Sequence, residues 1–213
     1  MVKDDITIGV IGIQGAVSEH VAMMKQVFSQ SKVNGTVEVI KPSSSLNGFD
    51  GVILPGGEST TISRVLQSSE LFDELHQKGS DGSLAIMGTC AGCILLAKEL
   101  EVADEHVSLL GLMDMKVQRN AYGRQKESFE QHLDISSIDS SDSLFPAVFI
   151  RAPVITRVWG NKNKVLASDS FQKPVLVQQD NLLALTFHPE LSFDHRIHSY
   201  FLSMIKKNSE LKT

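Results

Sequence analysis

Short apolar runs recur along the chain and predict the strands of a buried sheet. The first run, Ile6–Ile13, is almost continuous and rich in β-branched residues, which is typical of a strand buried on both faces of a parallel sheet. Further runs with strand character are TVEVI (36–40), GVILP (51–55), LAIMG (84–88) and NLLALTF (181–187).

Between these runs, apolar positions recur at helical spacing. One predicted helix carries Val17, Val21, Met24 and Phe28 on a single face. Helices are also predicted from about residue 60, over CAGCILLAKEL (90–100), and over SFDHRIHSYFLSMIKK (192–207), where Phe193, Ile197, Phe201 and Met204 form an apolar stripe. This alternation predicts an α/β fold: a doubly wound, mainly parallel central sheet of the flavodoxin type, with helices on both faces.

The middle of the chain has a different character. From about residue 113 to residue 173 the apolar segments are shorter and strand-like, for example AVFIRAPVITRVW (147–159), which predicts a small antiparallel extension. DISSIDSSDS (134–143) is polar and Ser-rich, and we expect a flexible surface loop there. Because no internal repeat or linker interrupts the pattern, residues 1–213 are expected to form one domain.

Composition narrows the class of protein. The 213 residues are 42% hydrophobic and 21% charged, with a net charge of −5 and a pI near 5.8, which gives no basic footprint for nucleic acid. No apolar run approaches the roughly 18 residues of a membrane span, and the start MVKDD is too acidic for a signal peptide. The two cysteines cannot build a disulfide framework, so we expect a cytoplasmic protein. The charge and the apolar pattern together lead us to expect that it binds neither nucleic acid nor membrane.

Cys90 lies in a setting that favours chemistry. It follows a predicted buried strand and begins a predicted helix, at the sheet edge where ligands bind in open α/β folds. Gly88 and Gly92 flank it, as a sharp turn that exposes a nucleophile requires. The helix N-terminus also stabilises a thiolate. The alternative is that Cys90 is simply packed in the core, as free cysteines often are.

A nucleophilic cysteine needs a base, and His188 is the best candidate. It directly follows the apolar run 181–187, so it is expected at the same edge of the sheet as Cys90. Pro189 stiffens the chain there, and Glu190 is close enough in sequence to reach the imidazole. Cys90, His188 and Glu190 are therefore predicted to form a Cys-His-Glu triad. The other histidines lie in polar or helical segments and are expected to be structural or solvated.

LPGGEST (54–60) is a third candidate element. It lacks the Lys and the spacing of a phosphate-binding Walker loop. The backbone N–H groups of Gly56 and Gly57 are instead predicted to contribute to an oxyanion hole. The alternative is an ordinary glycine-rich turn in which Ser59 or Thr60 caps the following helix.

The spacing of Cys90 and Cys93 also fits two other kinds of site. A structural zinc site needs about four ligands, but the chain has no second cysteine pair, and HRIH (195–198) fits better as the polar face of the last helix. A redox dithiol would leave the glycines and the HPE sequence (188–190) unexplained. We therefore expect no metal, and a Cys93 that packs in the core.

Together these motifs resemble those of the class I (triad) glutamine amidotransferases. GTCAG (88–92) and HPE are shared by that whole class. RNAYGRQ (119–125) and IRAP (150–153) resemble the Pdx2/PdxT family, the glutaminase subunits of pyridoxal 5′-phosphate synthase. The resemblance covers nearly the whole chain, including IGVIGIQGA (8–16) and FHPEL (187–191).

The resemblance implies an enzyme without a cofactor that hydrolyses L-glutamine to L-glutamate and ammonia through a γ-glutamyl thioester. Its implied glutamine pocket consists of Gly57, Glu58, Ser59, Arg119, Ile150 and Arg151. Arg119 would face the substrate's α-carboxylate. From the residues alone, Arg119 and Arg151 would be assigned to surface ion pairs. The oxyanion hole that the resemblance implies consists of Gly56, Gly57, Ala91, Gln14 and Gly15.

The family also implies a partner. This would be a synthase subunit of the Pdx1/PdxS type, a (β/α)8 barrel that takes up the ammonia in an assembly of twelve synthase and twelve glutaminase subunits. Two other hypotheses remain. One is the glutaminase subunit of a different amidotransferase, such as imidazole glycerol phosphate synthase. The other is a non-catalytic thiol sensor on the same fold, of the DJ-1-like type, which would not need His188 and Glu190.

Overall fold

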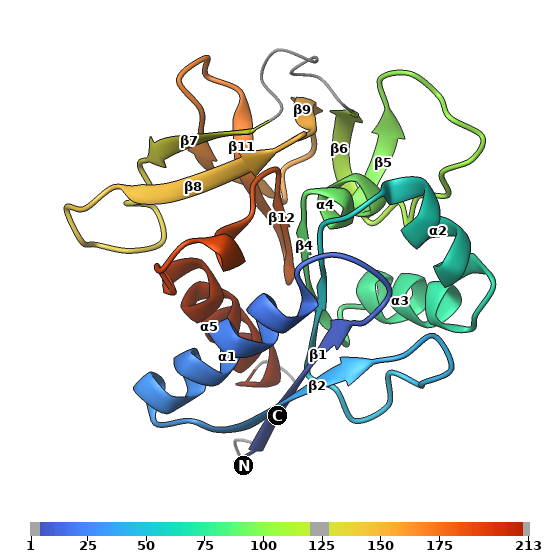
Figure 1. Cartoon of the computed structure of the whole chain (residues 1–213), viewed down its shortest axis with the longest axis horizontal. Helices are drawn as coiled ribbons and strands as arrows, with labels where there is room; N and C mark the ends of the chain where they lie inside the picture. The colour runs from blue at the N-terminus through green and yellow to red at the C-terminus, as the bar shows by residue number, and fades with distance from the viewer. Residues whose placement is uncertain (1–4, 120–127, 211–213) are drawn as a thin grey trace.

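A computed structural model describes residues 5–119 and 128–210 of the chain (Figure 1). Its centre is a seven-stranded sheet with the order β10-β11-β12-β4-β3-β1-β2. The strands are β1 (Asp5–Ile11), β2 (Asn34–Ile40), β3 (Gly51–Leu54), β4 (Ala85–Thr89), β10 (Asn163–Ser168), β11 (Pro174–Gln179) and β12 (Leu182–Leu185). The adjacent strands β2, β1, β3, β4 and β12 are parallel to one another. At the other edge, β11 is antiparallel to β12, and β10 is antiparallel to β11.

Helices cover both faces of this sheet (Figure 1). One face carries α1 (Val17–Ser31) and α5 (Arg196–Glu210), and the other carries α2 (Ser59–Gln67), α3 (Leu71–Ser80) and α4 (Ala91–Leu96). In β3, Ile53 packs into the cluster under α1 and α5, whereas Val52 and Leu54 pack into the other cluster. Since successive side chains of a strand point to opposite faces, two cores result. The predicted doubly wound sheet is confirmed.

Two small sheets lie beyond the ends of the parallel strands (Figure 1). One contains β5 (Ala97–Leu100), β6 (Met113–Gln118) and β9 (Val154–Val158), and the other pairs β7 (Ser128–Leu133) with β8 (Phe145–Ile150) in antiparallel fashion. The predicted extension is present, although β5 and β6 run parallel within it. The Ser-rich segment 134–143 lies outside helices and strands, and it buries the side chain of Ile135.

One helix prediction was wrong in its extent. The helix predicted over 90–100 ends at Leu96, because the next residues form β5 and pair with β6. Ion pairs at this junction join Lys98 to Asp114 at 2.5 Å and Lys116 to Glu99 at 3.1 Å. Tertiary pairing therefore overrides a sequence that favours helix. The helix predicted from about residue 60 is present as α2, and a second helix, α3, follows it after a break at Gln67.

The closing helix begins later than predicted. The Asp194 carboxylate accepts the backbone N–H of Arg196 at 3.0 Å, and α5 starts there. Phe193 therefore precedes the helix and is fully exposed, at 104%, instead of joining the apolar stripe. Ile197 and Phe201 are buried as expected. Among the described residues, no helix combines the length and apolar character that crossing a membrane would require.

Candidate active site

Cys90 occupies a strained turn between β4 and α4. Its φ is 50°, in the left-handed region that residues other than glycine rarely adopt. A methyl group at Gly88 would lie 2.6 Å from the Gly92 backbone, and one at Gly92 would lie 2.2 Å from the Leu54 carbonyl oxygen. Glycine is therefore required on both sides of the turn, and the structure places Cys90 at a strand-to-helix elbow.

Cys93 lies in a very different environment. It is fully buried within the cluster under α4, and both cysteines are free thiols. Burial, with a smaller contribution from the neighbouring Cys90, raises the pKa of the Cys93 thiol far above its usual range. A thiol that keeps its proton is a poor nucleophile. The described part of the chain contains no group of three or more potential metal-ligating side chains.

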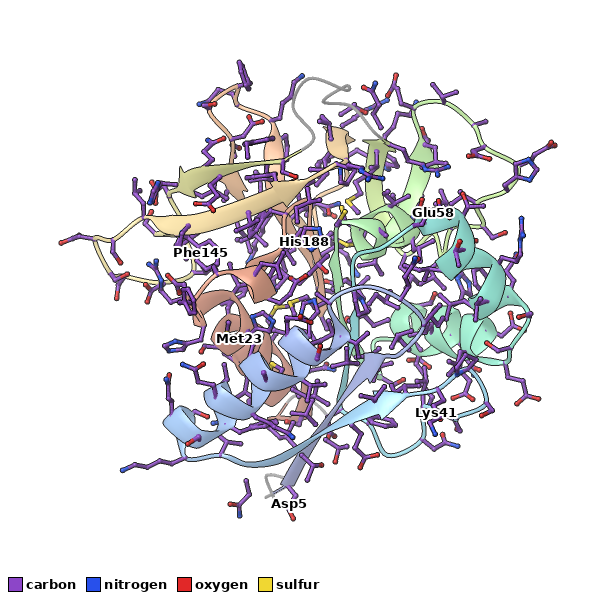
Figure 2. The ribbon with its side chains drawn as sticks, in the orientation of Figure 1. Asp5, Met23, Lys41, Glu58, Phe145 and His188 are labelled. Atoms are coloured by element: carbon purple, nitrogen blue, oxygen red, sulfur yellow. The ribbon has the colours of Figure 1, made fainter. Side chains whose placement is uncertain are left out.

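His188 is held between backbone and carboxylate. Its backbone N–H donates to the backbone carbonyl of Val148 in β8 at 2.8 Å. The short helix η1 (Pro189–Leu191) then folds Glu190 back, so that Glu190 Oε1 lies 2.7 Å from His188 Nδ1. Figure 2 shows His188 near the middle of the molecule, where it is buried. The sequence HPE thus brings the two side chains together.

The electrostatics favour a protonated imidazole. Burial lowers the pKa of His188, but hydrogen bonds from its ring to Cys90 and Glu190, together with the charges of those groups, outweigh burial and raise the pKa to about 10. Glu190 itself is buried, with a fully covered side chain. The three predicted triad residues therefore meet: Cys90 contacts His188, and His188 contacts Glu190.

Gly56 lies against the side chains of both Cys90 and His188. A methyl group at this position would meet His188 Cε1 at 2.4 Å and Cys90 Cβ at 3.2 Å. Gly15, with φ +95°, lies on the other side, where an added methyl would meet the Gly56 carbonyl oxygen at 1.8 Å. Gln14 Oε1 accepts the backbone N–H of Glu58 at 3.0 Å. The structure therefore brings the loops 14–15 and 56–58 together beside Cys90.

Ile150 and Arg151 border Cys90 from a third direction. The Ile150 carbonyl oxygen, at the end of β8, lies 3.8 Å from Cys90 Sγ. Arg151 is exposed and has a φ of 43°, so the chain turns sharply just beyond this contact. Ala91, the first residue of α4, is buried directly after Cys90.

Glu58 is the N-cap of α2, where Ser59 or Thr60 was the expected alternative. Its carboxylate accepts the backbone N–H groups of Thr60 at 3.0 Å and Thr61 at 2.7 Å. Partial burial raises the pKa of Glu58, but these hydrogen bonds outweigh it and lower the pKa to about 2. Ser59 is instead buried in the first turn of the helix. Glu58 thus binds the free backbone N–H groups of the first helical turn, a role that Ser, Thr, Asp or Asn usually has at an N-cap.

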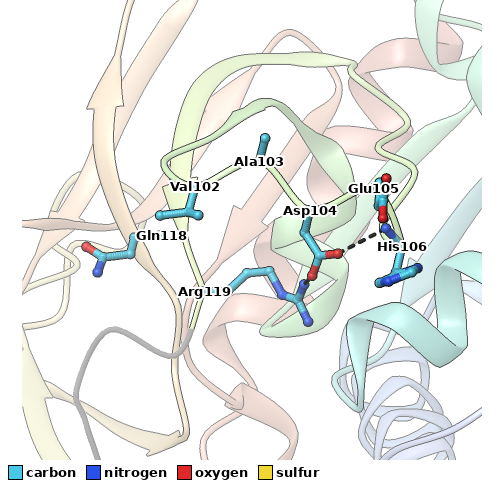
Figure 3. A pocket seen from close by; sticks show the side chains of 7 residues that line it. All are labelled: Val102, Ala103, Asp104, Glu105, His106, Gln118 and Arg119. Carbon is cyan, nitrogen blue, oxygen red and sulfur yellow. Dashed lines mark hydrogen bonds and ion pairs between the residues drawn. The ribbon is translucent and has the colours of Figure 1, made fainter.

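Arg119 already has partners in this structure. Its guanidinium forms an ion pair with Asp104, lies 3.5 Å from Glu58 Oε1, and donates to Thr60 Oγ1 at 3.2 Å. Figure 3 shows Arg119 and Asp104 in a hollow of about 600 Å³ formed by residues 102–106, Gln118 and Arg119. This hollow does not include Cys90 or His188 among its lining residues. The rest of the RNAYGRQ motif lies outside the described residues.

Two further histidines were missed. His20 and His198 are fully buried, and His20 Nδ1 lies 3.0 Å from His198 Nε2. His20 Nε2 lies 3.3 Å from both Thr89 Oγ1 and Glu190 Oε2. The assignment of HRIH to a polar helix face was wrong for His198, since it faces the interior beside Ile197. A signal was present, because His20 falls three residues after Val17 and four before Met24, on the predicted apolar stripe.

Known proteins have sequences similar to that of this chain. Residues 10–207 match the family model described as the SNO glutamine amidotransferase family. A Thermococcus onnurineus protein named pyridoxal 5′-phosphate synthase subunit PdxT is 50% identical over 197 residues, covering 92% of this chain and 98% of that protein. A Pyrococcus furiosus protein of the same name is 48% identical and covers 94% of this chain and 99% of that protein.

Solved structures agree. A crystal structure described as a glutamine amidotransferase superposes with a TM-score of 0.79 at 42% identity, covering 93% of this chain and 98% of that one. A Thermotoga maritima glutamine amidotransferase, at 13% identity and a TM-score of 0.59, shares the fold over 97% of this chain and 96% of that one. The chain belongs to the SNO glutamine amidotransferase family.

Proposed function

We propose that this protein is the glutaminase subunit of a pyridoxal 5′-phosphate synthase, which releases ammonia from L-glutamine through Cys90. The observation that carries the proposal is the buried contact series from Cys90 to His188 to Glu190 at the carboxyl edge of the sheet. The names of the relatives from Thermococcus and Pyrococcus support the choice of synthase.

The reaction proceeds by covalent catalysis. The raised pKa of His188 favours transfer of the Cys90 proton to its imidazole, and the resulting thiolate attacks the side-chain amide carbon of glutamine. His188 then donates that proton to the departing nitrogen, so that ammonia leaves and a γ-glutamyl thioester remains. Water, deprotonated by His188, attacks the thioester and releases glutamate and the free thiol. Glu190 fixes the ring with Nδ1–H directed toward its own carboxylate and stabilises the imidazolium.

The negative oxygen of each tetrahedral intermediate needs N–H donors. We assign this oxyanion hole to backbone N–H groups of Gly56, Gly57, Ala91, Gln14 and Gly15. The close approach of Gly15 to Gly56, which itself contacts Cys90, supports the assignment. One such donor typically contributes about 10²–10³ in kcat.

The glutamine pocket is assigned to Gly57, Glu58, Ser59, Arg119, Ile150 and Arg151. The Ile150 carbonyl, 3.8 Å from Cys90 Sγ, is well placed to accept a hydrogen bond from an N–H group of the substrate near the reacting carbon. Arg119 carries the charge that the substrate's α-carboxylate needs, but it is paired with Asp104. Binding of glutamine is therefore proposed to exchange the Asp104 carboxylate for that of the substrate.

The ammonia is proposed to pass to a synthase subunit of the (β/α)8-barrel type, in the mixed ring assembly implied by the resemblance. This single-domain protein would act in the cytoplasm, and none of the steps above requires a cofactor or metal. A glutaminase that released ammonia without its partner would waste substrate, so we propose that the partner activates it.

The test is the release of glutamate from glutamine, measured with and without the synthase subunit of the same organism. Wild-type protein with the synthase is expected to release glutamate, and Cys90→Ala with the synthase is expected to release none. Trapping of a γ-glutamyl adduct on Cys90, seen as a mass increase of the intact protein, would identify the thioester. Wild-type turnover by Cys90→Ala would contradict the proposal.

A further inference from the structure

The second carboxylate oxygen of Glu190 is buried and lacks an obvious partner. Oε1 binds His188, but within residues 5–119 and 128–210 no donor makes a well-aligned hydrogen bond to Oε2. A buried carboxylate oxygen needs a donor, because burial removes the water that would otherwise solvate it. The group within reach is Nε2 of His20, at 3.3 Å.

His20 connects the triad to two other elements. It lies on α1, and its Nε2 is also 3.3 Å from the hydroxyl of Thr89, the residue before Cys90. Its Nδ1 lies 3.0 Å from Nε2 of His198 on α5. The contact with Thr89 has hydrogen-bond geometry, whereas the equally close approach to Glu190 Oε2 is less well aligned.

The contacts determine which nitrogen of each ring carries the proton. If His20 were protonated on Nδ1, its bare Nε2 would face the Glu190 carboxylate, and His198 would hold a buried Nδ1–H that has no partner. With the proton on Nε2, His20 donates toward Glu190 and accepts the Nε2–H of His198 at Nδ1. His198 Nδ1 is then an unprotonated nitrogen, which is less costly to leave unpaired than a donor.

Both rings are neutral, so they orient Glu190 without cancelling its charge. Burial, then the proximity of His198 and His188, lowers the pKa of His20 well below 6.5. Burial, with a smaller effect of His195, lowers the pKa of His198 to about 3. A protonated His20 would compete with His188 for the negative charge of Glu190, whereas a neutral one leaves that charge to His188.

We propose that His20 is a positioning residue for glutamine hydrolysis: its Nε2–H holds the Glu190 carboxylate so that Oε1 faces His188, and His198 fixes the tautomer of His20. This inference rests on the triad proposed above. His20 is not expected to touch glutamine, because it lies on the far side of Glu190 from His188.

A matched pair of substitutions tests the inference. His20→Gln keeps an N–H donor close to the position of Nε2, whereas His20→Met has similar length and no donor. In the complex with the synthase, His20→Met is expected to lower kcat for glutamate release roughly tenfold to a hundredfold, the range for removing a group that orients a metal-bound histidine. KM should change little. His20→Gln should recover most of kcat.

A spectroscopic measurement covers the case in which His20→Met does not fold. In the ¹⁵N spectrum of wild-type protein labelled at histidine, His20 should show the neutral Nε2–H tautomer. In His20→Gln, the Nδ1–H resonance of His188 should stay at the wild-type position, whereas in a folded His20→Met it should move. A neutral Nδ1–H tautomer of His20 would overturn the inference.

Two kinetic results would also overturn it. One is a folded His20→Met with wild-type kcat, and the other is a folded His20→Gln as slow as His20→Met. Thermal unfolding and synthase binding of each variant establish that the fold is intact. Cys90→Ala, assayed in parallel, separates the two proposals: its loss of activity beside a fully active His20→Met would reject the role of His20 alone, whereas an active Cys90→Ala would reject the triad itself.

Discussion

The two halves of the candidate site are built in different ways. Glu190 is wholly buried and His188 is almost so, and both are fixed by short contacts to the interior. Glu58 lies half-exposed at the start of α2 (Figure 2), and Arg119 reaches it from the end of β6, so that each charge already has a partner. The proposed reacting groups are therefore preorganised, whereas the charges proposed to recognise the substrate would have to change partners. Substitutions in the first half should affect kcat, and those in the second should affect KM.

The largest expected effect separates two cysteines that are only three positions apart. Cys90→Ala should lower glutaminase activity by roughly 10⁴-fold or more, since it removes the nucleophile of a triad. Cys93→Ala should keep most of the activity, because Cys93 only packs in the core. Glutamate release with the synthase measures both. If the two folded variants were equally inactive, the distinction drawn between the elbow and the core would be wrong.

A smaller effect on kcat is expected from adding one methyl group. In Gly56→Ala, the new Cβ would lie 2.4 Å from His188 Cε1, so the ring must move away from its position beside Cys90. A misplacement of about 1 Å can lower the rate about 10²-fold. Gly82→Ala is the control, since its methyl meets nothing within 4 Å and only the backbone is strained. Equal kcat values for the two variants would contradict a tightly packed triad.

The other half of the site should respond in KM. Arg119→Met is expected to raise KM for glutamine roughly tenfold to a hundredfold, as loss of a hydrogen bond to a charged group costs about 1.5–3 kcal/mol. Asp104→Asn removes the competing carboxylate and should lower KM or leave it unchanged. Steady-state kinetics over a range of glutamine concentrations gives both values. An unchanged KM in Arg119→Met would remove Arg119 from the pocket.

The smallest effect concerns stability and pH. Glu58→Ala should lower the free energy of unfolding at neutral pH by about 1 kcal/mol, because α2 loses its N-cap. The pKa of Glu58 is about 2 in the folded protein and 4.5 without the fold. Its contribution is thus fully present above pH 4.5 and disappears as the pH falls through 2. Urea unfolding of both proteins at several pH values should show the difference shrinking; a constant difference would argue against a charged cap.

The sequence was most informative where structure is determined locally. The apolar runs located strands of the parallel sheet, and the residues just after two of them, Cys90 and His188, meet at its edge. It was least informative where tertiary contacts decide. The change from helix to strand at Ala97 depends on pairing with β6. The ion pair between Arg119 and Asp104 likewise joins a strand end to a loop, a proximity that no spacing predicts.

Buried histidines illustrate the same limit. A histidine on an apolar stripe is compatible with several environments, and the sequence does not show which polar groups face it. His20 obtains its partners from β4, η1 and α5, which lie far apart along the chain. The spacing of His20 from Val17 and Met24 is compatible with an inward-facing position, but only the assembled fold shows that it lies against Glu190.

The contact between Gly92 and Leu54 has a consequence for engineering. Helix α4 rests directly on the backbone of β3, without a side chain in between that could be made larger or smaller. The depth and direction of the nucleophile are therefore not adjustable by substitution at this contact. If Arg119 binds the substrate as proposed, attempts to redirect the enzyme to other amides have a better target in the charges around Arg119, which can be changed while the elbow stays as it is.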